Sequence, residues 1–138
     1  MGVCRGRLSE GLDFKDRKGR CVIIVGIPYP NAFDPKIILK KHFLDEKVKL
    51  QGIEVRTDDG KIIQNIPGNY WYSQLAYCAV NQAIGRVIRH VRDFGSILLF
   101  DKRYADRWNR EKLSRWLQDC ITSPSTIDEG LNKLESFY

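Results

Sequence analysis

One stretch in the second half of the chain decides how the rest is interpreted: Asn81-Gln82-Ala83-Ile84-Gly85-Arg86-Val87-Ile88-Arg89-His90. On a helical wheel of about 100° per residue, its polar donors and its glycine share an arc of roughly 100°. These residues are Gln82, Gly85, Arg86 and Arg89. The opposite side is apolar and consists of Ala76, Val80, Ala83, Ile84, Val87 and Ile88. The pattern predicts a helix with one face in the core and one face of hydrogen-bond donors.

The donor face suits a polyanionic ligand. Guanidinium is planar, permanently charged and able to bind two phosphate oxygens at once. Arg86 and Arg89 lie on neighbouring turns, and Gly85 lets a ligand approach the backbone. The alternative, which these residues alone leave open, is a solvated basic face over an ordinary core.

The composition is that of one folded domain. The chain has 138 residues, of which 43% are hydrophobic and 11% aromatic, enough to form a core. Lys and Arg number 23 against 17 Asp and Glu, and the net charge of +6 favours a phosphate-bearing partner. No apolar run approaches the roughly 18 residues of a membrane-spanning helix, so we expect no membrane partner.

The cysteines do not follow the spacing of a metal site. Cys4, Cys21, Cys78 and Cys120 lie far apart, form no C-x-x-C pair and have only two histidines to help them. This spacing argues against a metal ion or an iron–sulfur cluster bound by this chain. We expect reduced, mostly buried thiols instead.

Alternating strand and helix patterns predict an α/β fold with a mostly parallel sheet flanked by helices. The apolar runs 21–27 and 96–100 predict strands buried on both faces, beside a short strand at residues 3–5. Helices are predicted from Asp34 to about Glu46, from residues 67–69 to near His90, over residues 110–120, and after Ser125 or Thr126. Three strands are few for such a fold, so we expect an incomplete sheet.

Several segments keep more than one interpretation. Asp101-Lys102-Arg103-Tyr104 follows a strand, where α/β sheets present functional groups, but a salt bridge and a buried tyrosine ring are the alternative. The last helix is either packed on the core or a docking surface. Residues 47–66 are predicted to form a surface insertion, with a turn at residues 57–60 that favours a hairpin. In the helix over residues 110–120, Leu113, Trp116 and Leu117 are expected to face inward.

Two motifs resemble those of a known family. Residues 3–14, Val-Cys-Arg-Gly-Arg-Leu-Ser-Glu-Gly-Leu-Asp-Phe, resemble motif V of the XPD/DinG-type superfamily 2 iron–sulfur DNA helicases, and residues 82–90 resemble their motif VI. Residues 26–30, 71–72, 92–95 and 101–104 are similar to the eukaryotic branch that contains the telomere-length regulator and Fanconi anaemia group J helicases. The resemblance implies that residues 1–138 are one C-terminal helicase domain, a partial RecA-like fold of the P-loop NTPase type.

The resemblance also implies a role for each motif residue. In this family, ATP with Mg²⁺ binds between two RecA-like domains, and motif VI of the second domain completes the site. Arg86 and Arg89 would act as arginine fingers on the γ-phosphate, and Gln82 would order the phosphate. The nucleotide side would also include Glu10, Gly11, Asp13 and Gly85. The DNA backbone would be contacted by Arg5, Gly6, Arg7 and Ser9.

The chain also departs from the family's complete members. It has no G-x-x-x-x-G-K-[ST] phosphate loop, no Asp-Glu-Ala-His box and no cysteine cluster, which those members carry in their N-terminal part. We therefore expect most of the ATP and Mg²⁺ ligands, and the 4Fe-4S cluster, to belong to that part and not to this chain. The abrupt start at residues 1–5 favours an N-terminally truncated piece of a longer gene product, and an independent remnant is the alternative.

Two functions of different class remain. The first is the C-terminal motor half of an ATP-dependent 5′-to-3′ DNA helicase in nuclear DNA repair and telomere maintenance, inactive when alone. Its partners would be single-stranded or forked DNA and the N-terminal RecA-like domain of the same protein. The second is a non-catalytic basic module that binds nucleic acid or protein. Nothing in the sequence indicates an oligomeric state.

Overall fold

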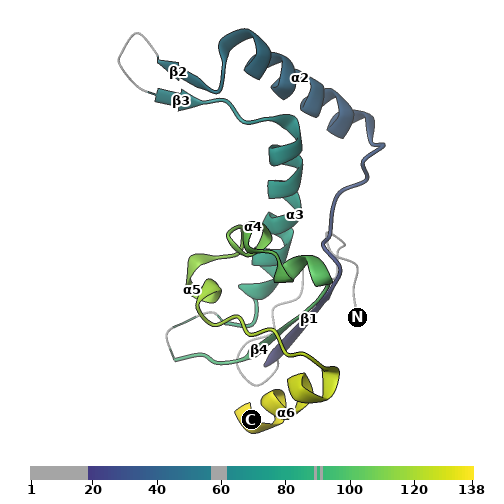
Figure 1. The fold of residues 1–138 in the computed structure, drawn as a ribbon, viewed down its shortest axis with the longest axis vertical. Coiled ribbons are helices and arrows are strands. Elements are labelled where there is room, and N and C mark those ends of the chain that lie inside the picture. The colour runs from purple at the N-terminus through teal and green to yellow at the C-terminus, as the bar shows by residue number, and fades with distance from the viewer. Residues whose placement is uncertain (1–18, 57–61, 89, 91) are drawn as a thin grey trace. The chain divides into compact units, whose positions relative to one another are not determined.

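The computed structural model describes residues 19–56, 62–88, 90 and 92–138 (Figure 1). It has two compact units, each described by itself below. Residues 19–27 with Ala79–Tyr138 form the sheet unit, and Pro28–Cys78 form the hairpin unit. Helix α3 (Gly68–Ile84) gives its first turns to the hairpin unit and its last turns to the sheet unit. Among the described residues, no helix is long and apolar enough to cross a lipid bilayer. The strand predicted at residues 3–5 lies outside the described residues.

A parallel pair of strands forms the centre of the sheet unit (Figure 1). β1 (Cys21–Val25) pairs with β4 (Ser96–Phe100), with Cys21 opposite Ser96 and Val25 opposite Phe100. Backbone hydrogen bonds extend the ladder at both ends, from the Ser96 amide to the Arg20 carbonyl (2.8 Å) and from the Gly26 amide to the Phe100 carbonyl (3.0 Å). Both strands were predicted from their apolar runs, and the run of β1 is also rich in β-branched residues. The α/β class with a parallel sheet is confirmed.

The prediction that both strands are buried on both faces is wrong. In β4, no residue is buried and Phe100 is 49% exposed. Ile24 is 3% exposed, whereas its neighbours Ile23 and Val25 are 58% and 81% exposed. Successive side chains of a strand point to opposite faces, so one face of β1 packs on the core and the other faces solvent. A continuous apolar run cannot distinguish this case from burial on both faces, because the difference lies in the neighbouring layer.

The prediction of mostly buried thiols is also wrong for the described cysteines. Cys21, Cys78 and Cys120 are free and exposed, and Cys4 lies outside the described residues. Cys21 shares the solvent face of β1 with Ile23, because strand residues two apart point the same way.

A turn and two short helices follow β4 in place of the single helix predicted over residues 110–120. They are η2 (Lys102–Ala105), α4 (Arg107–Arg110) and α5 (Arg115–Gln118). The break comes at Ser114, whose backbone amide donates to Asn81 Oδ1 (2.9 Å) and not to a helical carbonyl. Leu113 and Leu117 are buried as predicted, but Trp116, which lies within α5, is 49% exposed.

The last helix, α6 (Ile127–Phe137), begins where it was predicted. Thr126 Oγ1 accepts a hydrogen bond from the Glu129 amide (3.1 Å), and the Glu129 carboxylate accepts one from the Ser125 amide (2.8 Å). At its other end, the Tyr138 hydroxyl donates to the Arg20 carbonyl. No residue of α6 is buried, and Ile127, Leu131 and Phe137 are 71%, 53% and 52% exposed, so the choice between packing and docking stays open.

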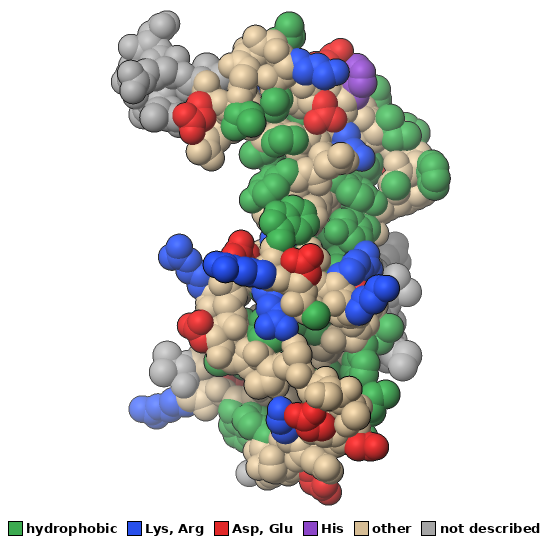
Figure 2. Space-filling view, viewed as in Figure 1, with side chains coloured by type: hydrophobic (Ala, Val, Ile, Leu, Met, Phe, Trp, Pro, Cys, Tyr) green, Lys and Arg blue, Asp and Glu red, His purple; other side chains and the backbone are tan. Residues whose placement is uncertain are grey.

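The hairpin unit contains α2 (Pro35–Gln51), β2 (Glu54–Arg56) and β3 (Ile62–Gln64). Asp34 caps α2 by accepting a hydrogen bond from the Lys36 amide (2.9 Å), as predicted. The helix passes the predicted end near Glu46 and stops at Gly52, whose φ of +76° favours glycine. β2 and β3 pair antiparallel, which confirms the hairpin, although its turn lies outside the described residues. Figure 2 shows apolar side chains at the surface of this unit.

A close backbone contact joins α2 to α3 within the hairpin unit. A Cβ atom at Gly68 would lie 2.7 Å from Lys41 Cα, so only glycine allows this approach. The Gly68 amide donates to Asp45 Oδ1 (2.8 Å), which makes a side chain of α2 the cap of α3. The rings of Tyr29 and Tyr72 stack at 5.2 Å, and the Tyr72 hydroxyl donates to the Pro30 carbonyl (2.6 Å). Sequence patterns indicated none of these long-range contacts.

Replacing Gly68 by Ala is expected to lower the free energy of unfolding by about 1–3 kcal/mol, because the added methyl group must push the Lys41 backbone away. Urea unfolding followed by circular dichroism measures the loss. Gly130→Ala is the control, because the nearest atom to its added Cβ is a proline ring carbon at 3.2 Å, and alanine favours the helix. Equal losses in both variants would contradict the close contact.

Candidate functional site

Helix α3 ends earlier than predicted. The long helix was expected to continue to near His90, but α3 stops at Ile84. The Gly85 amide still donates to the Asn81 carbonyl (2.9 Å), after which the spacing tightens, with Arg86 bonded to Ala83 (3.2 Å). Glycine and the β-branched residues that follow it favour a helix poorly, which explains the early end. Gly85 and Arg86 therefore lie in a tight turn at the end of α3.

The two predicted faces of this segment are confirmed for the described residues. Ala76, Val80 and Ile84 are completely buried, and Val87 is 5% exposed. These positions recur every three or four residues and make the apolar stripe of the helix. On the other side, Gln82 and Gly85 are exposed and Arg86 is half-buried.

The structure brings three of the predicted site residues together. Gln82, Gly85 and Arg86 lie within one turn, because positions three and four apart neighbour each other on a helix. Arg89 lies outside the described residues. So do the motif V residues, namely Arg5, Gly6, Arg7, Ser9, Glu10, Gly11 and Asp13. Their roles stay predictions.

The chemistry of the described trio fits a phosphate group. Gln82 carries an exposed amide, Gly85 has no side chain to block the backbone, and Arg86 carries a guanidinium group. Guanidinium binds phosphate oxygens in pairs.

Asn81, directly before this trio, is an anchor that sequence reasoning did not assign. Its Nδ2 donates to the Lys112 carbonyl (3.0 Å), while its Oδ1 accepts from the Ser114 amide (2.9 Å) and hydroxyl (3.1 Å). The side chain therefore joins α3 to the turn between α4 and α5. The signal in the sequence was an asparagine, a poor helix former, inside an otherwise strong helix pattern.

The chain after the site is fixed to the start of β1. Arg20 Nη1 donates to Asp93 Oδ1 (2.6 Å) and to the Phe94 carbonyl (2.7 Å), and its guanidinium lies 4.0 Å from the centre of the Phe94 ring. The Asp93 side chain is only 2% exposed, so this ion pair is shielded on the carboxylate side. A Cβ at Gly95 would lie 2.7 Å from the Arg20 carbonyl oxygen. Residues 93–95 thus hold the exit of the motif VI segment against the sheet.

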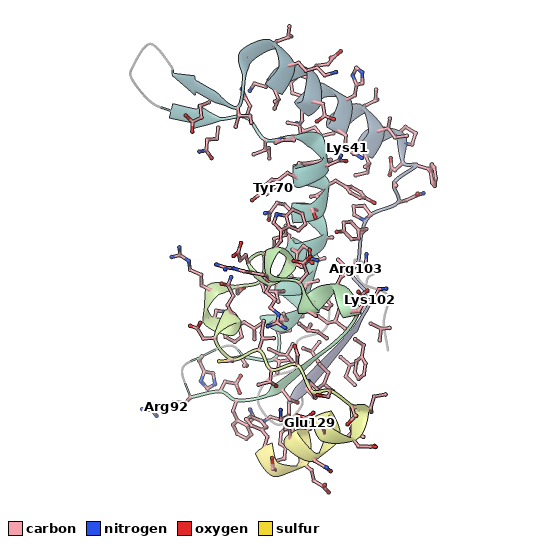
Figure 3. All side chains as sticks on the ribbon, in the orientation of Figure 1. Lys41, Tyr70, Arg92, Lys102, Arg103 and Glu129 are labelled. Carbon is pink, nitrogen blue, oxygen red and sulfur yellow. The ribbon has the colours of Figure 1, made fainter. Side chains whose placement is uncertain are left out.

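At the carboxyl end of β4, the salt-bridge interpretation is confirmed. Arg103 donates twice to the Asp101 carboxylate, from Nε (2.9 Å) and Nη2 (2.7 Å), and these hydrogen bonds lower the pKa of Asp101 to about 2. Tyr104 is 4% exposed, and its hydroxyl donates to the Gly26 carbonyl (3.2 Å). Figure 3 shows Lys102 and Arg103 together at this end and Arg92 away from them, at the turn before β4.

Lys112 is a partly buried cation in the sheet unit. Its ammonium group lies over the ring of Trp108, and its backbone carbonyl accepts the hydrogen bond from Asn81. Burial lowers the pKa of Lys112 to about 8, against the opposing charge of Asp106. A charged lysine at neutral pH therefore carries a desolvation cost at this position.

Metal-ligand side chains do not gather into a cluster in the described part of the chain. Within residues 19–56, 62–88, 90 and 92–138, no three His, Cys, Asp or Glu side chains come together as ligands.

Comparisons with known proteins agree with the motif resemblance. The family model described as the helicase C-terminal domain matches residues 1–120. The chain is 51% identical over 140 residues to the regulator of telomere elongation helicase 1 homolog of Aedes aegypti. It is 42% identical over 138 residues to that of Arabidopsis thaliana, and 49% identical over 121 residues to that of Drosophila grimshawi.

These relatives are much longer proteins. The matches cover 100%, 100% and 88% of this chain, but only 13%, 13% and 11% of the three relatives in the same order. The chain spans about an eighth of the length of the curated relatives it matches. The family match and these identities confirm the resemblance to an XPD/DinG-type C-terminal helicase domain.

Replacing Asn81 by Ala is expected to lower the free energy of unfolding by about 2–3 kcal/mol, because three hydrogen bonds are lost and partly buried partners remain unsatisfied. Chemical denaturation measures this change. The neighbouring exposed Gln82→Ala is the matched control and should stay within about 0.5 kcal/mol of the parent. A parent-like Asn81→Ala would contradict the anchor.

The pKa of Lys112 predicts a stability change at alkaline pH. Because its pKa is about 8 in the folded protein and 10.5 in the reference state, the unfolded state binds more protons between these values. The free energy of unfolding should therefore gain a rising contribution from pH 8 to 10.5. Lys112→Met removes the charge and this contribution, so the advantage of the variant over the parent should shrink across that window. A constant difference, measured by denaturation at several pH values, would contradict the burial effect.

Proposed function

This chain belongs to the helicase C-terminal domain family, in its XPD/DinG-type branch, and we propose that it is the second motor domain of an ATP-dependent 5′-to-3′ DNA helicase. The relatives are named for the regulation of telomere elongation. We extend this to the present chain as a role in nuclear DNA repair and telomere maintenance. Its substrate would be single-stranded or forked DNA.

One observation carries the proposal. The end of α3 buries Val80, Ile84 and Val87 and leaves Gln82 and Gly85 exposed on the other side, in a segment that lies inside the family match. A rigid helix end with one face in its own core can offer its other face to a second lobe. The fit of these side chains to phosphate supports a nucleotide site shared between two domains.

Each residue of this face has a proposed task. Bound ATP with Mg²⁺ would supply the phosphoryl group whose transfer to water drives movement. Arg86 and Arg89 would donate to γ-phosphate oxygens and stabilise the charge that develops there. Gln82 would hold a phosphate or link it to motif V, and Gly85 would allow close approach. Glu10, Gly11 and Asp13 would complete the nucleotide side of the cleft.

Coupling to DNA would depend on motif V. Arg5, Gly6, Arg7 and Ser9 would bind the strand through its phosphates, which carry no base identity. One domain would then carry both contact sets, so that closing on ATP changes its grip on the strand. The first RecA-like domain, with the phosphate loop, would be the required partner, and this chain alone would not hydrolyse ATP. The 4Fe-4S cluster of the family would likewise belong to that other part.

A chimera tests the arginine roles. This chain replaces the matching segment of the Aedes aegypti relative, to which it is 51% identical, and DNA-stimulated ATP hydrolysis is measured. Arg86→Ala and Arg89→Ala should each lower kcat by about 10³ or more, because the transition-state charge loses a donor. The affinity for single-stranded DNA should change little, since the arginines act on the nucleotide.

Arg92→Ala is the matched control for this experiment. Arg92 is an exposed arginine of the following turn, and its loss should leave kcat near the parent value. Normal turnover in Arg86→Ala and Arg89→Ala would remove the arginine-finger assignment. If the chimera with the unchanged sequence binds DNA but hydrolyses no ATP, the non-catalytic module is favoured instead.

A further inference from the structure

Helix α2 is apolar on two sides, a pattern that is typical of a helix covered on both. On the side that faces α3, the Lys41 ammonium lies 5.2 Å from the centre of the Tyr72 ring, and Asp45 caps α3. Ile37, Leu44 and Val48 share this side and are partly buried. This side of α2 therefore makes these contacts with α3.

The opposite side of α2 carries exposed apolar side chains. Leu39 is 70% exposed, Phe43 is 55% exposed and Leu50 is 86% exposed. At about 100° per residue they fall within an arc of roughly 40°, so they form one stripe along the helix. Figure 2 shows apolar side chains at the surface over α2, interleaved with basic ones. Contiguous apolar surface rimmed by charge marks interaction sites.

A row of lysines borders this stripe and repeats its spacing. Lys36, Lys40 and Lys47 lie four and seven residues apart, as do Leu39, Phe43 and Leu50. The row touches the stripe, because Lys40 Nζ lies 5.2 Å from the centre of the Phe43 ring. On the other border, a carboxylate oxygen of Glu46 lies 3.6 Å from His42 Nδ1. The three lysines and the three apolar residues are called the α2 outer face, and its two borders differ in charge.

We propose that the α2 outer face binds an amphipathic protein segment with apolar side chains over Leu39, Phe43 and Leu50 and carboxylates against the lysine row. Charge complementarity identifies this occupant, since Asp and Glu beside apolar anchors match lysines beside an apolar stripe. A nucleic-acid backbone would satisfy the lysines but leave the stripe in water. Recognition of an amphipathic helix uses apolar anchors at this spacing, with border charges that set the orientation. The residues differ from those assigned to nucleotide and DNA, so the proposal does not depend on the proposed function.

A display library of random peptides tests the occupant. The 138-residue chain is immobilised, and the selected peptides should combine Leu, Ile or Phe at helical spacing with Asp or Glu on one side. Their affinity, measured by fluorescence anisotropy, should fall at least about tenfold for Leu39→Ser/Phe43→Ser. The affinity should fall similarly for Lys36→Glu/Lys40→Glu. When that variant is the immobilised target, the library should instead yield peptides with basic residues. Circular dichroism checks that each variant keeps its helix content.

Ile38→Ser/Lys49→Glu is the matched control. These residues have the same chemical types on the same helix but lie outside the arc of the outer face, so peptide affinity should be unchanged. Absence of enrichment above bare resin, or binding that resists the outer-face changes, would overturn the proposal. The same variants are also tested with an oligothymidine strand and with vesicles of phosphatidylcholine and phosphatidylserine. If Leu39→Ser/Phe43→Ser weakens binding to one of these probes but not to the peptides, the partner is nucleic acid or lipid and the proposal is overturned.

Discussion

Burial of one side of α3 is the interaction on which the candidate site depends. Ala76, Val80 and Ile84 are completely buried, which fixes the rotation of the helix about its own axis. Because side chains leave a helix in fixed directions, this also fixes where the opposite residues point. Gln82 and Gly85 are exposed as a consequence, because the buried side of the helix already sets their direction. The hydrophobic core thus orients polar groups that it does not touch.

The segment after α3 is held by geometry as much as by polar contacts. Glycine at position 95 lets the chain pass close to the Arg20 carbonyl, to which the Ser96 amide then donates. Arg20 in turn pairs with Asp93, whose side chain is almost fully buried, so removal of the arginine would take a charge-assisted hydrogen bond from a shielded carboxylate. Residues 93–95 are therefore fixed by the start of β1, and the chain up to Val87 is fixed by the core stripe of α3.

The sequence predicted features that depend on local pattern and missed those that depend on distant partners. Apolar periodicity was enough for the faces of α3, and the Asp34 cap was enough for the start of α2. The division into α4 and α5 could not be predicted, because the amide of Ser114 is taken by Asn81, far away in the chain. The cap of α3 by Asp45 was missed for the same reason. In the candidate site, motif resemblance assigned roles to residues whose chemistry alone also fitted a solvated basic face.

Two exposed apolar surfaces in this molecule differ in what they reveal about a neighbour. On β1, Ile23 and Val25 form an exposed apolar face. Parallel sheets are normally covered on both faces, and any well-packed apolar layer would cover this one. Such a face sets affinity for a neighbour but not its identity, since the hydrophobic effect has no direction. The α2 outer face adds charge, with Lys40 against Phe43 on one border and Glu46 on the other. A partner with apolar side chains and with carboxylates on one side would cover the stripe and pair with the lysines at once. The α2 outer face can therefore discriminate between partners, which the β1 face cannot.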